Sequence, residues 1–149
     1  NTMSNFEATQ AAAASGGARG KLYASSGAGK LRSFTSTYTS VSGSEPQVAD
    51  TIEWGTLPAG ARIHGNLSSF NYSAGNAGMT LTLGDADDGN FILAATDMGT
   101  SAGVTTLPLV NVDGAVYVNT SPLTLVSTLA VDEMLADQVI TLTIVYTLD

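Results

Sequence analysis

The chain has 149 residues, of which 44% are hydrophobic, 12% are charged and none is cysteine. This length predicts one domain with a sizeable core, and the lack of cysteine excludes disulfides, thiol nucleophiles and cysteine-ligated metals. The net charge of −8 argues against a nucleic-acid partner, which requires a cationic face, and no apolar run approaches the ~20 residues of a membrane span.

The charges are distributed unevenly along the sequence. All five basic residues lie within the first 62 positions, whereas residues 63–149 contain nine acids and no lysine or arginine. This asymmetry predicts an acidic body that carries a mildly basic arm. The low charged fraction indicates a surface rich in serine, threonine and asparagine, which is more typical of assembled or extracellular surfaces than of soluble enzymes.

Residues 1–32 are predicted to form a flexible arm rich in alanine, glycine and serine, which fill 17 of the first 31 positions. Within the arm, residues 5–15 favour a short helix, because the alanine run 11–14 has high helix propensity and the glycine pair 16–17 would end it. A helix of about ten residues is marginally stable alone. The arm therefore needs a partner surface to become ordered.

Residues 33–149 are predicted to form an all-β domain, a jelly roll or β-sandwich, with no long helix. Strands are expected at residues 33–41, 50–54, 61–72, 79–83, 91–95, 104–110, 115–118, 123–129 and 139–148. A bulge or bend near Ser68-Ser69 would reconcile the two apolar parities of the 61–72 strand. The predicted core residues are Ile52, Trp54, Ile63, Leu67, Met79, Leu81, Leu83, Ile140, Leu142 and Ile144.

Two connections carry turn chemistry. Residues 57–60, Leu-Pro-Ala-Gly, place proline second and glycine fourth, as a type I turn prefers. The acidic stretch 85–90 is predicted to be a polar loop between two strands, and residues 131–137 could hold one helical turn. Strand order is not predictable from these local patterns, because strand pairing is non-local.

Several features resemble chemical sites, and each has a plainer interpretation. The single histidine, His64, would have to serve any Ser-His-Asp triad, yet the sequence lacks a G-x-S-x-G turn, so an exposed or interface histidine is expected. Residues 25–30 lack the first glycine and the final hydroxyl of a phosphate-binding loop. The loop 85–90 departs from the calcium-loop pattern, and it and the acids at 132, 133 and 137 are interpreted as solvated turns. The sequence therefore predicts no catalytic residue, metal site or cofactor, and no enzyme.

Three stretches together resemble the small decoration (cement) proteins of tailed-phage heads. In residues 52–63 a strand runs into a Leu-Pro-Ala-Gly-Ala-Arg turn and then a second strand. Residues 79–96 are similar to the family's passage of strand, Leu-Gly, acidic turn and strand, and residues 140–146 are similar to its terminal strand ending in tyrosine. The resemblance covers roughly residues 33–149, through short motifs.

This resemblance implies a jelly-roll body, often trimeric, on the outer face of an icosahedral capsid, and it supplies no catalytic residues. The predicted function is that of a structural decoration protein, which binds the major capsid protein on the outer surface of the virion and stabilises the head. Two alternatives stay open from the sequence. One is a receptor- or glycan-binding β-sandwich of a viral fibre or spike, and the other is a small β-fold hydrolase.

The partners are predicted to be the major capsid protein and further copies of the chain, with no nucleic acid and no membrane. Open strand edges with almost no lysine favour self-association, and the resemblance favours a homotrimer. The arm, which matches no family motif, is predicted from its composition to attach the body to the capsid or to a neighbouring subunit. The predicted contact residues are Phe6, Arg19, Lys21, Leu22, Tyr23, Lys30, Leu31 and Arg32.

Overall fold

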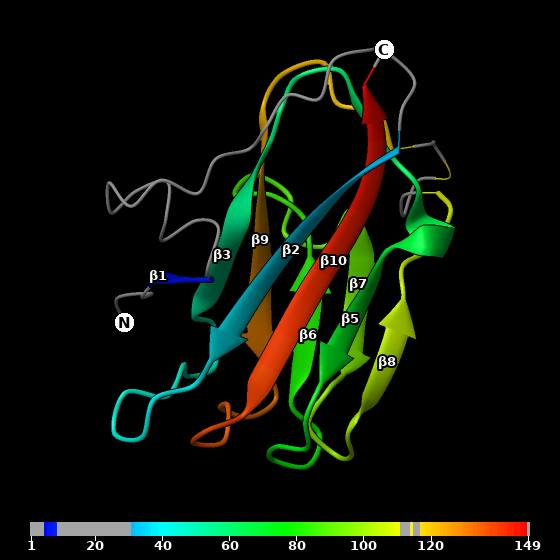
Figure 1. Cartoon of the computed structure of the whole chain (residues 1–149). Coiled ribbons are helices and arrows are strands. Elements are labelled where there is room, and N and C mark those ends of the chain that lie inside the picture. Colours follow the sequence, from blue (N-terminus) through cyan, green and yellow to red (C-terminus); the bar gives the residue numbers. More distant parts are fainter. Residues whose placement is uncertain (1–4, 9–30, 111–113, 115–116, 149) are drawn as a thin grey trace.

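The computed structural model describes residues 5–8, 31–110, 114 and 117–148. These residues form two β-sheets that pack face to face as a β-sandwich (Figure 1). The structure thereby confirms the predicted all-β class. Among the described residues, no helix has the length and apolar character needed to cross a membrane.

The elements divide between the two sheets as follows. The first sheet contains, in spatial order, β1 (Asn5–Glu7), β3 (Thr51–Leu57), β9 (Leu123–Ala130), β6 (Thr80–Leu83) and β7 (Leu93–Asp97). The second sheet contains β2 (Leu31–Thr39), β10 (Val139–Leu148), β5 (Ser69–Tyr72) and β8 (Gly103–Thr106). The short strand β4 (Ala61–Ile63) pairs with the C-terminal end of β10, and the 3-10 helix η1 (Gly65–Leu67) connects β4 to β5.

The strand pairing is that of a jelly roll. With β1 set aside and β4 and β5 counted as one interrupted strand, the first strand pairs with the last (β2 and β10) and the second with the seventh (β3 and β9). The third pairs with the sixth (β5 and β8), and the fourth with the fifth (β6 and β7). A ribbon of antiparallel pairs rolled up in this way gives two packed four-stranded sheets.

The predicted helix at residues 5–15 is wrong where the structure describes it. Residues 5–7 form β1, which pairs in parallel with β3, and the Phe6 ring meets the Tyr38 ring edge-on at a centroid distance of 5.9 Å. Ala8 is fully buried and donates its N–H to the Glu53 carbonyl at 2.7 Å. Pairing with an open sheet edge and burial outweigh the local helix propensity here. Residues 9–15 lie outside the described residues.

The predicted strand at residues 61–72 is divided into β4, η1 and β5. The change of apolar parity comes from η1, which ends at Leu67, next to the predicted bulge or bend; the interruption is a 3-10 turn and not a bulge. The Ser68 hydroxyl donates to the His64 carbonyl and accepts the Val145 N–H, both at 2.9 Å, which fixes the turn against β10. Leu67 is wrong as a core residue, because it is the last residue of η1 and 51% of its surface is exposed.

The turn between β3 and β4 is displaced by one residue from the prediction. The Ala61 N–H donates to the Pro58 carbonyl at 3.3 Å, so Pro58 is the first residue of the turn and Gly60 the third. Gly60 has a φ of +85°, the left-handed conformation that a type II turn requires at this position. A non-glycine residue would be strained there.

The remaining predicted strands agree with the structure to different extents. β10 has the predicted bounds, β9 ends one residue later than predicted, and β6 begins one residue later. The strand expected at 91–95 is β7 at Leu93–Asp97, and the strand expected at 104–110 is the shorter β8. Of the strand expected at 115–118, the described part contains a single bridge between Val118 and Arg62, and residues 115–116 lie outside the described residues. The acidic loop joins β6 to β7 as predicted.

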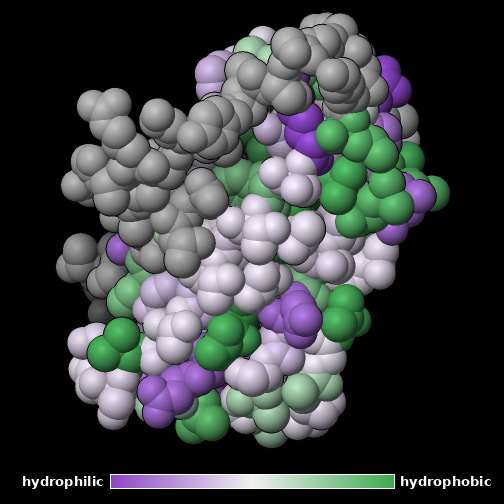
Figure 2. Space-filling view, in the orientation of Figure 1, coloured by the Kyte–Doolittle hydropathy of each residue, from purple (hydrophilic) through white to green (hydrophobic). Residues whose placement is uncertain are grey.

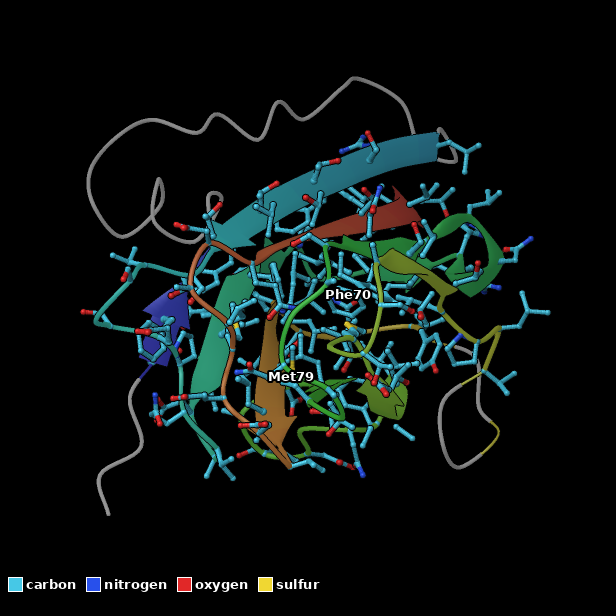
Figure 3. All side chains as sticks on the ribbon, turned by 90° about the horizontal axis from the view of Figure 1, so that it is seen from below. Phe70 and Met79 are labelled. Atoms are coloured by element: carbon cyan, nitrogen blue, oxygen red, sulfur yellow. The ribbon has the colours of Figure 1, made fainter. Side chains whose placement is uncertain are left out.

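The hydrophobic core lies between the two sheets (Figure 3). Nine of the ten predicted core residues are buried there, all except Leu67. At its centre, the Trp54 ring from β3 packs edge-on against the Phe70 ring from β5 at a centroid distance of 5.5 Å. The Trp54 Nε1 also donates to the Ser127 Oγ at 2.8 Å, so its one polar group is paired. These two residues therefore bridge the sheets.

Candidate interaction surfaces

Four connections meet at one end of the sandwich, the lower end in Figure 1. They are residues 40–50 between β2 and β3, 73–79 between β5 and β6, 98–102 between β7 and β8, and 131–138 between β9 and β10. The jelly-roll topology brings these segments together although they are far apart in the sequence. This set of residues is called the loop end below, and Figure 3 views the molecule from that side.

Hydrogen bonds join the four loops into one unit. The buried Gln138 is the central residue: its Nε2 donates to the Met98 carbonyl at 2.9 Å and to the Ser73 carbonyl at 3.2 Å. Backbone bonds add further links between the β2–β3 and β9–β10 loops, including Met134 N–H to the Pro46 carbonyl at 3.0 Å. Because buried polar groups are costly to leave unpaired, this network holds the loop end in one arrangement.

The charged side chains of the loop end are all acidic. Glu45, Asp50, Asp132, Glu133 and Asp137 lie in its loops, which contain no lysine or arginine. A sixth acid, Asp97, ends β7 beside them and accepts hydrogen bonds from the Thr100 hydroxyl and from the Thr100 and Gly99 N–H groups; these bonds lower the pKa of its carboxyl. The loop end is therefore anionic at neutral pH.

Exposed aliphatic side chains lie among these acids. They are Val41, Val48, Val131 and Leu135, with Val139 at the start of β10. Val131 is the most exposed of them, with 72% of its surface accessible. Exposed apolar side chains that gather on one surface mark a contact with another protein, and the surrounding acids favour a partner of opposite charge.

A second candidate surface is the outer face of the β2–β10–β5–β8 sheet. The register places Thr35 opposite Thr143 and Thr37 opposite Thr141, and the latter two hydroxyls lie 3.0 Å apart. Ser69 and Asn71 continue the face on β5. This face is turned to the viewer in Figure 2, where it is mostly pale because serine and threonine have intermediate hydropathy. The prediction of strand faces rich in serine and threonine agrees with this surface.

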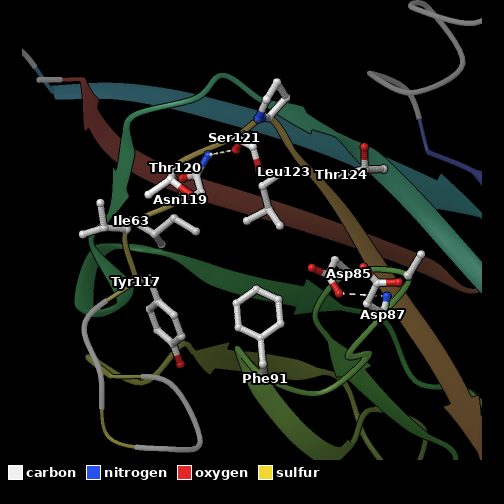
Figure 4. Close-up of a pocket in the computed structure, with 13 residues that line it drawn as sticks. Ile63, Asp85, Asp87, Phe91, Tyr117, Asn119, Thr120, Ser121, Leu123 and Thr124 are labelled. Atoms are coloured by element: carbon white, nitrogen blue, oxygen red, sulfur yellow. Dashed lines mark hydrogen bonds between the residues drawn. The ribbon is translucent and has the colours of Figure 1, made fainter.

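A hollow of about 460 Å³ lies at the opposite end of the sandwich, between the β6–β7 loop and residues 117–124 (Figure 4). Several of its polar groups are held by the protein's own backbone, whereas the buried Asn119 Oδ1 has no hydrogen-bond partner among the described residues. The Asp85 Oδ1 accepts the N–H groups of Asp87 and Asp88, the Asn119 Nδ2 donates to the Pro58 and Ser121 carbonyls, and the Tyr117 hydroxyl donates to the Ile92 carbonyl. Burial raises the pKa of Tyr117 to about 12, so its phenol stays neutral. These groups fix the surrounding loops.

The predicted contact residues of the arm are placed by the structure only in part. Phe6 is half-buried against the sandwich's own Tyr38. Leu31 and Arg32 form the start of β2, where Leu31 is 63% exposed and Arg32 is half-buried. The other five residues lie outside the described residues, and they are Arg19, Lys21, Leu22, Tyr23 and Lys30. The contact set therefore stays a prediction.

His64 is half-buried, and its Nε2 lies 3.2 Å from the Thr147 Oγ1 on the neighbouring strand β10. This contact between neighbouring strands agrees with a histidine on the sheet surface. Among the described residues, no three acids or histidines are grouped closely enough to hold a metal ion.

The sequence did not reveal the loop end, because its members come from four loops that are far apart along the chain. The one sequence signal that pointed to acidic loops was that most acids of the body lie outside the predicted strands.

Comparison with known proteins shows the fold. The sequence matches no protein-family model and no curated protein. Among solved structures, a chain of the capsid of Ralstonia phage GP4 has a TM-score of 0.77 and 19% identity, over 98% of this chain and 99% of that chain. A chain of the capsid asymmetric unit of cyanophage Pam1 has a TM-score of 0.62 and 19% identity, over 89% of this chain and 96% of that one. The chain therefore shares its fold with chains of two phage capsid structures.

Proposed function

We propose that this chain is a structural protein of a phage capsid, and that it decorates the outer face of the shell by binding the major capsid protein. The observation that carries the proposal is the likeness, over nearly the full length of both chains, to a chain in the GP4 capsid structure. The resemblance of residues 52–63, 79–96 and 140–146 to decoration proteins supports the finer assignment. The loop end and the threonine-rich face supply surfaces suited to protein contacts.

Co-sedimentation tests this proposal. Empty shells assembled from the major capsid protein of the same phage are mixed with increasing amounts of the chain and pelleted. The chain is expected to pellet with the shells and to saturate at a fixed ratio to the shell subunits, because a symmetric lattice offers a fixed number of equivalent sites. A chain that stays in the supernatant at every concentration would contradict the proposal.

We further propose that the chain acts as a homotrimer. The uncharged threonine-rich face supports this, since it can be covered by another subunit without burying charge. Strand edges support it as well: β1 covers the edge of β3, but β7, β2 and β8 remain at sheet edges, where proteins commonly place pairing partners or lysines. The described residues include no lysine.

Light scattering on the purified chain measures the oligomeric state directly. The expected mass is about 45 kDa at micromolar concentration, three times the 15.1 kDa of one chain. A mass of one chain together with full binding to shells would show that the trimer does not form in advance of binding.

The N-terminal arm is proposed as one attachment element. Arg19, Lys21 and Lys30 give it a positive charge, so the arm can bind an acidic patch on the shell or on a neighbouring subunit. Residues 5–7 of this segment (β1) add a strand to the edge of the chain's own first sheet, and strand addition is a common way for an extended segment to bind.

A further inference from the structure

We infer that the loop end is a docking surface for a cationic protein surface with exposed apolar groups, located on the capsid shell. The inference deepens the proposed function, on which it rests, because it names the part of the body that faces the shell. It is supported by the exposed aliphatic side chains, the uniform sign of the charges and the conformation of Val131. The loop end would then act as a second contact beside the arm.

The conformation of Val131 is the most unusual backbone feature of the described chain. Its φ is +73°, in the left-handed region that β-branched residues rarely adopt. The other two non-glycine residues with positive φ among the described residues are Ala49 and Asp137, and they also belong to the loop end. Asp137 tolerates this conformation well, whereas Val131 and Ala49 are strained.

Folding alone gives no reason for a valine at this position. Its side chain is 72% exposed, so it adds little to the core, and glycine or asparagine would fit the backbone with less strain. Strained residues persist at functional sites, where the side chain that they present is needed. The side chain presented here is an aliphatic group on the first residue of the β9–β10 loop, beside the loop that carries Val48.

The rigid base of the loop end suits it to binding. The Ala49 N–H donates to the Leu129 carbonyl at 2.9 Å, so the β2–β3 loop is held next to the strand that leads to Val131. The Asn76 Nδ2 donates to the Glu133 carbonyl at 2.9 Å, which ties the β5–β6 loop to the same turn. A surface held in place before binding loses less conformational entropy when the partner arrives.

Charge identifies the chemistry of the partner. With five acids in its loops, Asp97 beside them and no basic residue, the loop end repels nucleic acids and anionic lipids and attracts lysine and arginine side chains. Its exposed aliphatic groups require apolar groups on the partner as well. The opposite end also carries acids, in the β6–β7 loop, but the described arginines Arg32 and Arg62 lie there as well, and no non-glycine residue described at that end has a positive φ.

Two variants test the inference by co-sedimentation of the full chain with empty shells. Val131→Asn removes the aliphatic group while relieving backbone strain, so it is expected to keep or raise the melting temperature. It is expected to weaken shell binding about tenfold, the loss that corresponds to one valine no longer buried. The double variant Asp132→Asn with Asp137→Asn is expected to weaken binding several-fold and to reduce its salt dependence, because fewer charge contacts remain to be screened.

Matched controls lie at the opposite end of the sandwich. Leu109→Asn changes another aliphatic residue, 62% exposed, and Asp87→Asn with Asp88→Asn removes the same number of charges. Both controls are expected to bind shells as the wild type does. Weaker binding of the controls than of the loop-end variants would overturn the inference, and so would wild-type affinity in both loop-end variants, although the proposed function would then stand. A wild-type chain that does not bind shells would overturn both.

Discussion

Trp54→Ala is expected to lower the free energy of unfolding by about 3–5 kcal/mol, as measured by denaturant titration. Trp54 is fully buried, it packs on Phe70 of the opposite sheet, and its Nε1 bonds to Ser127. The substitution leaves a cavity between the sheets and an unpaired buried hydroxyl. Domains of this size usually have free energies of unfolding of about 5–15 kcal/mol. The variant is therefore expected to lose a large part of its stability, and it stays folded when the wild type lies in the upper part of that range.

Leu67→Ala is the matched control. Leu67 is half-exposed in η1, so its truncation is expected to change the free energy of unfolding by less than about 1 kcal/mol. Equal losses in the two variants would show that Leu67 contributes to the core as much as Trp54 does, contrary to the sandwich described here.

Deleting residues 1–31 is expected to reduce the affinity for shells on the order of a hundredfold while leaving a folded body, because the contacts of a linked attachment segment are then lost together. The eight paired strands of the jelly roll retain their partners without this segment. Circular dichroism reports the folded state, and co-sedimentation with shells reports the affinity.

Two further variants separate the possible causes of that loss. Deleting residues 1–8 removes β1 and uncovers the edge of β3, but it keeps the basic residues of the arm. Arg19→Gln, Lys21→Gln and Lys30→Gln together keep β1 and remove the charges, and they are expected to weaken binding less than the deletion and mainly at low salt. If the chain without residues 1–31 binds shells with wild-type affinity, the arm does not attach the body, and the contact lies in the body alone.

Local patterns predicted the elements whose environment is set by their own sequence. The ten-residue strand β10 was predicted with its bounds because every second residue from Ile140 is large and apolar, and that face is buried along most of its length. The loop between β6 and β7 was predicted because acids and glycine disfavour both regular structures. In both cases the residue pattern and the final environment agree.

The errors arose where distant contacts decide the structure. Helix propensity favoured a helix from Asn5, but the edge of β3, which begins 46 residues later at Thr51, offers hydrogen bonds and burial to an extended chain. Strand periodicity placed Leu67 in the core, but η1 interrupts the strand. The loop end could not be predicted for the same reason, because its four loops meet only through the jelly-roll strand order.

The most direct test of the capsid assignment is a density map of empty shells of the phage, recorded with and without the added chain. Extra density is expected on the outer face of the shell, shaped as two packed sheets and grouped in threes. The loop that contains Val131 and Asp132 is expected to point toward the shell. Maps that do not differ, or extra density on the inner face, would contradict the assignment.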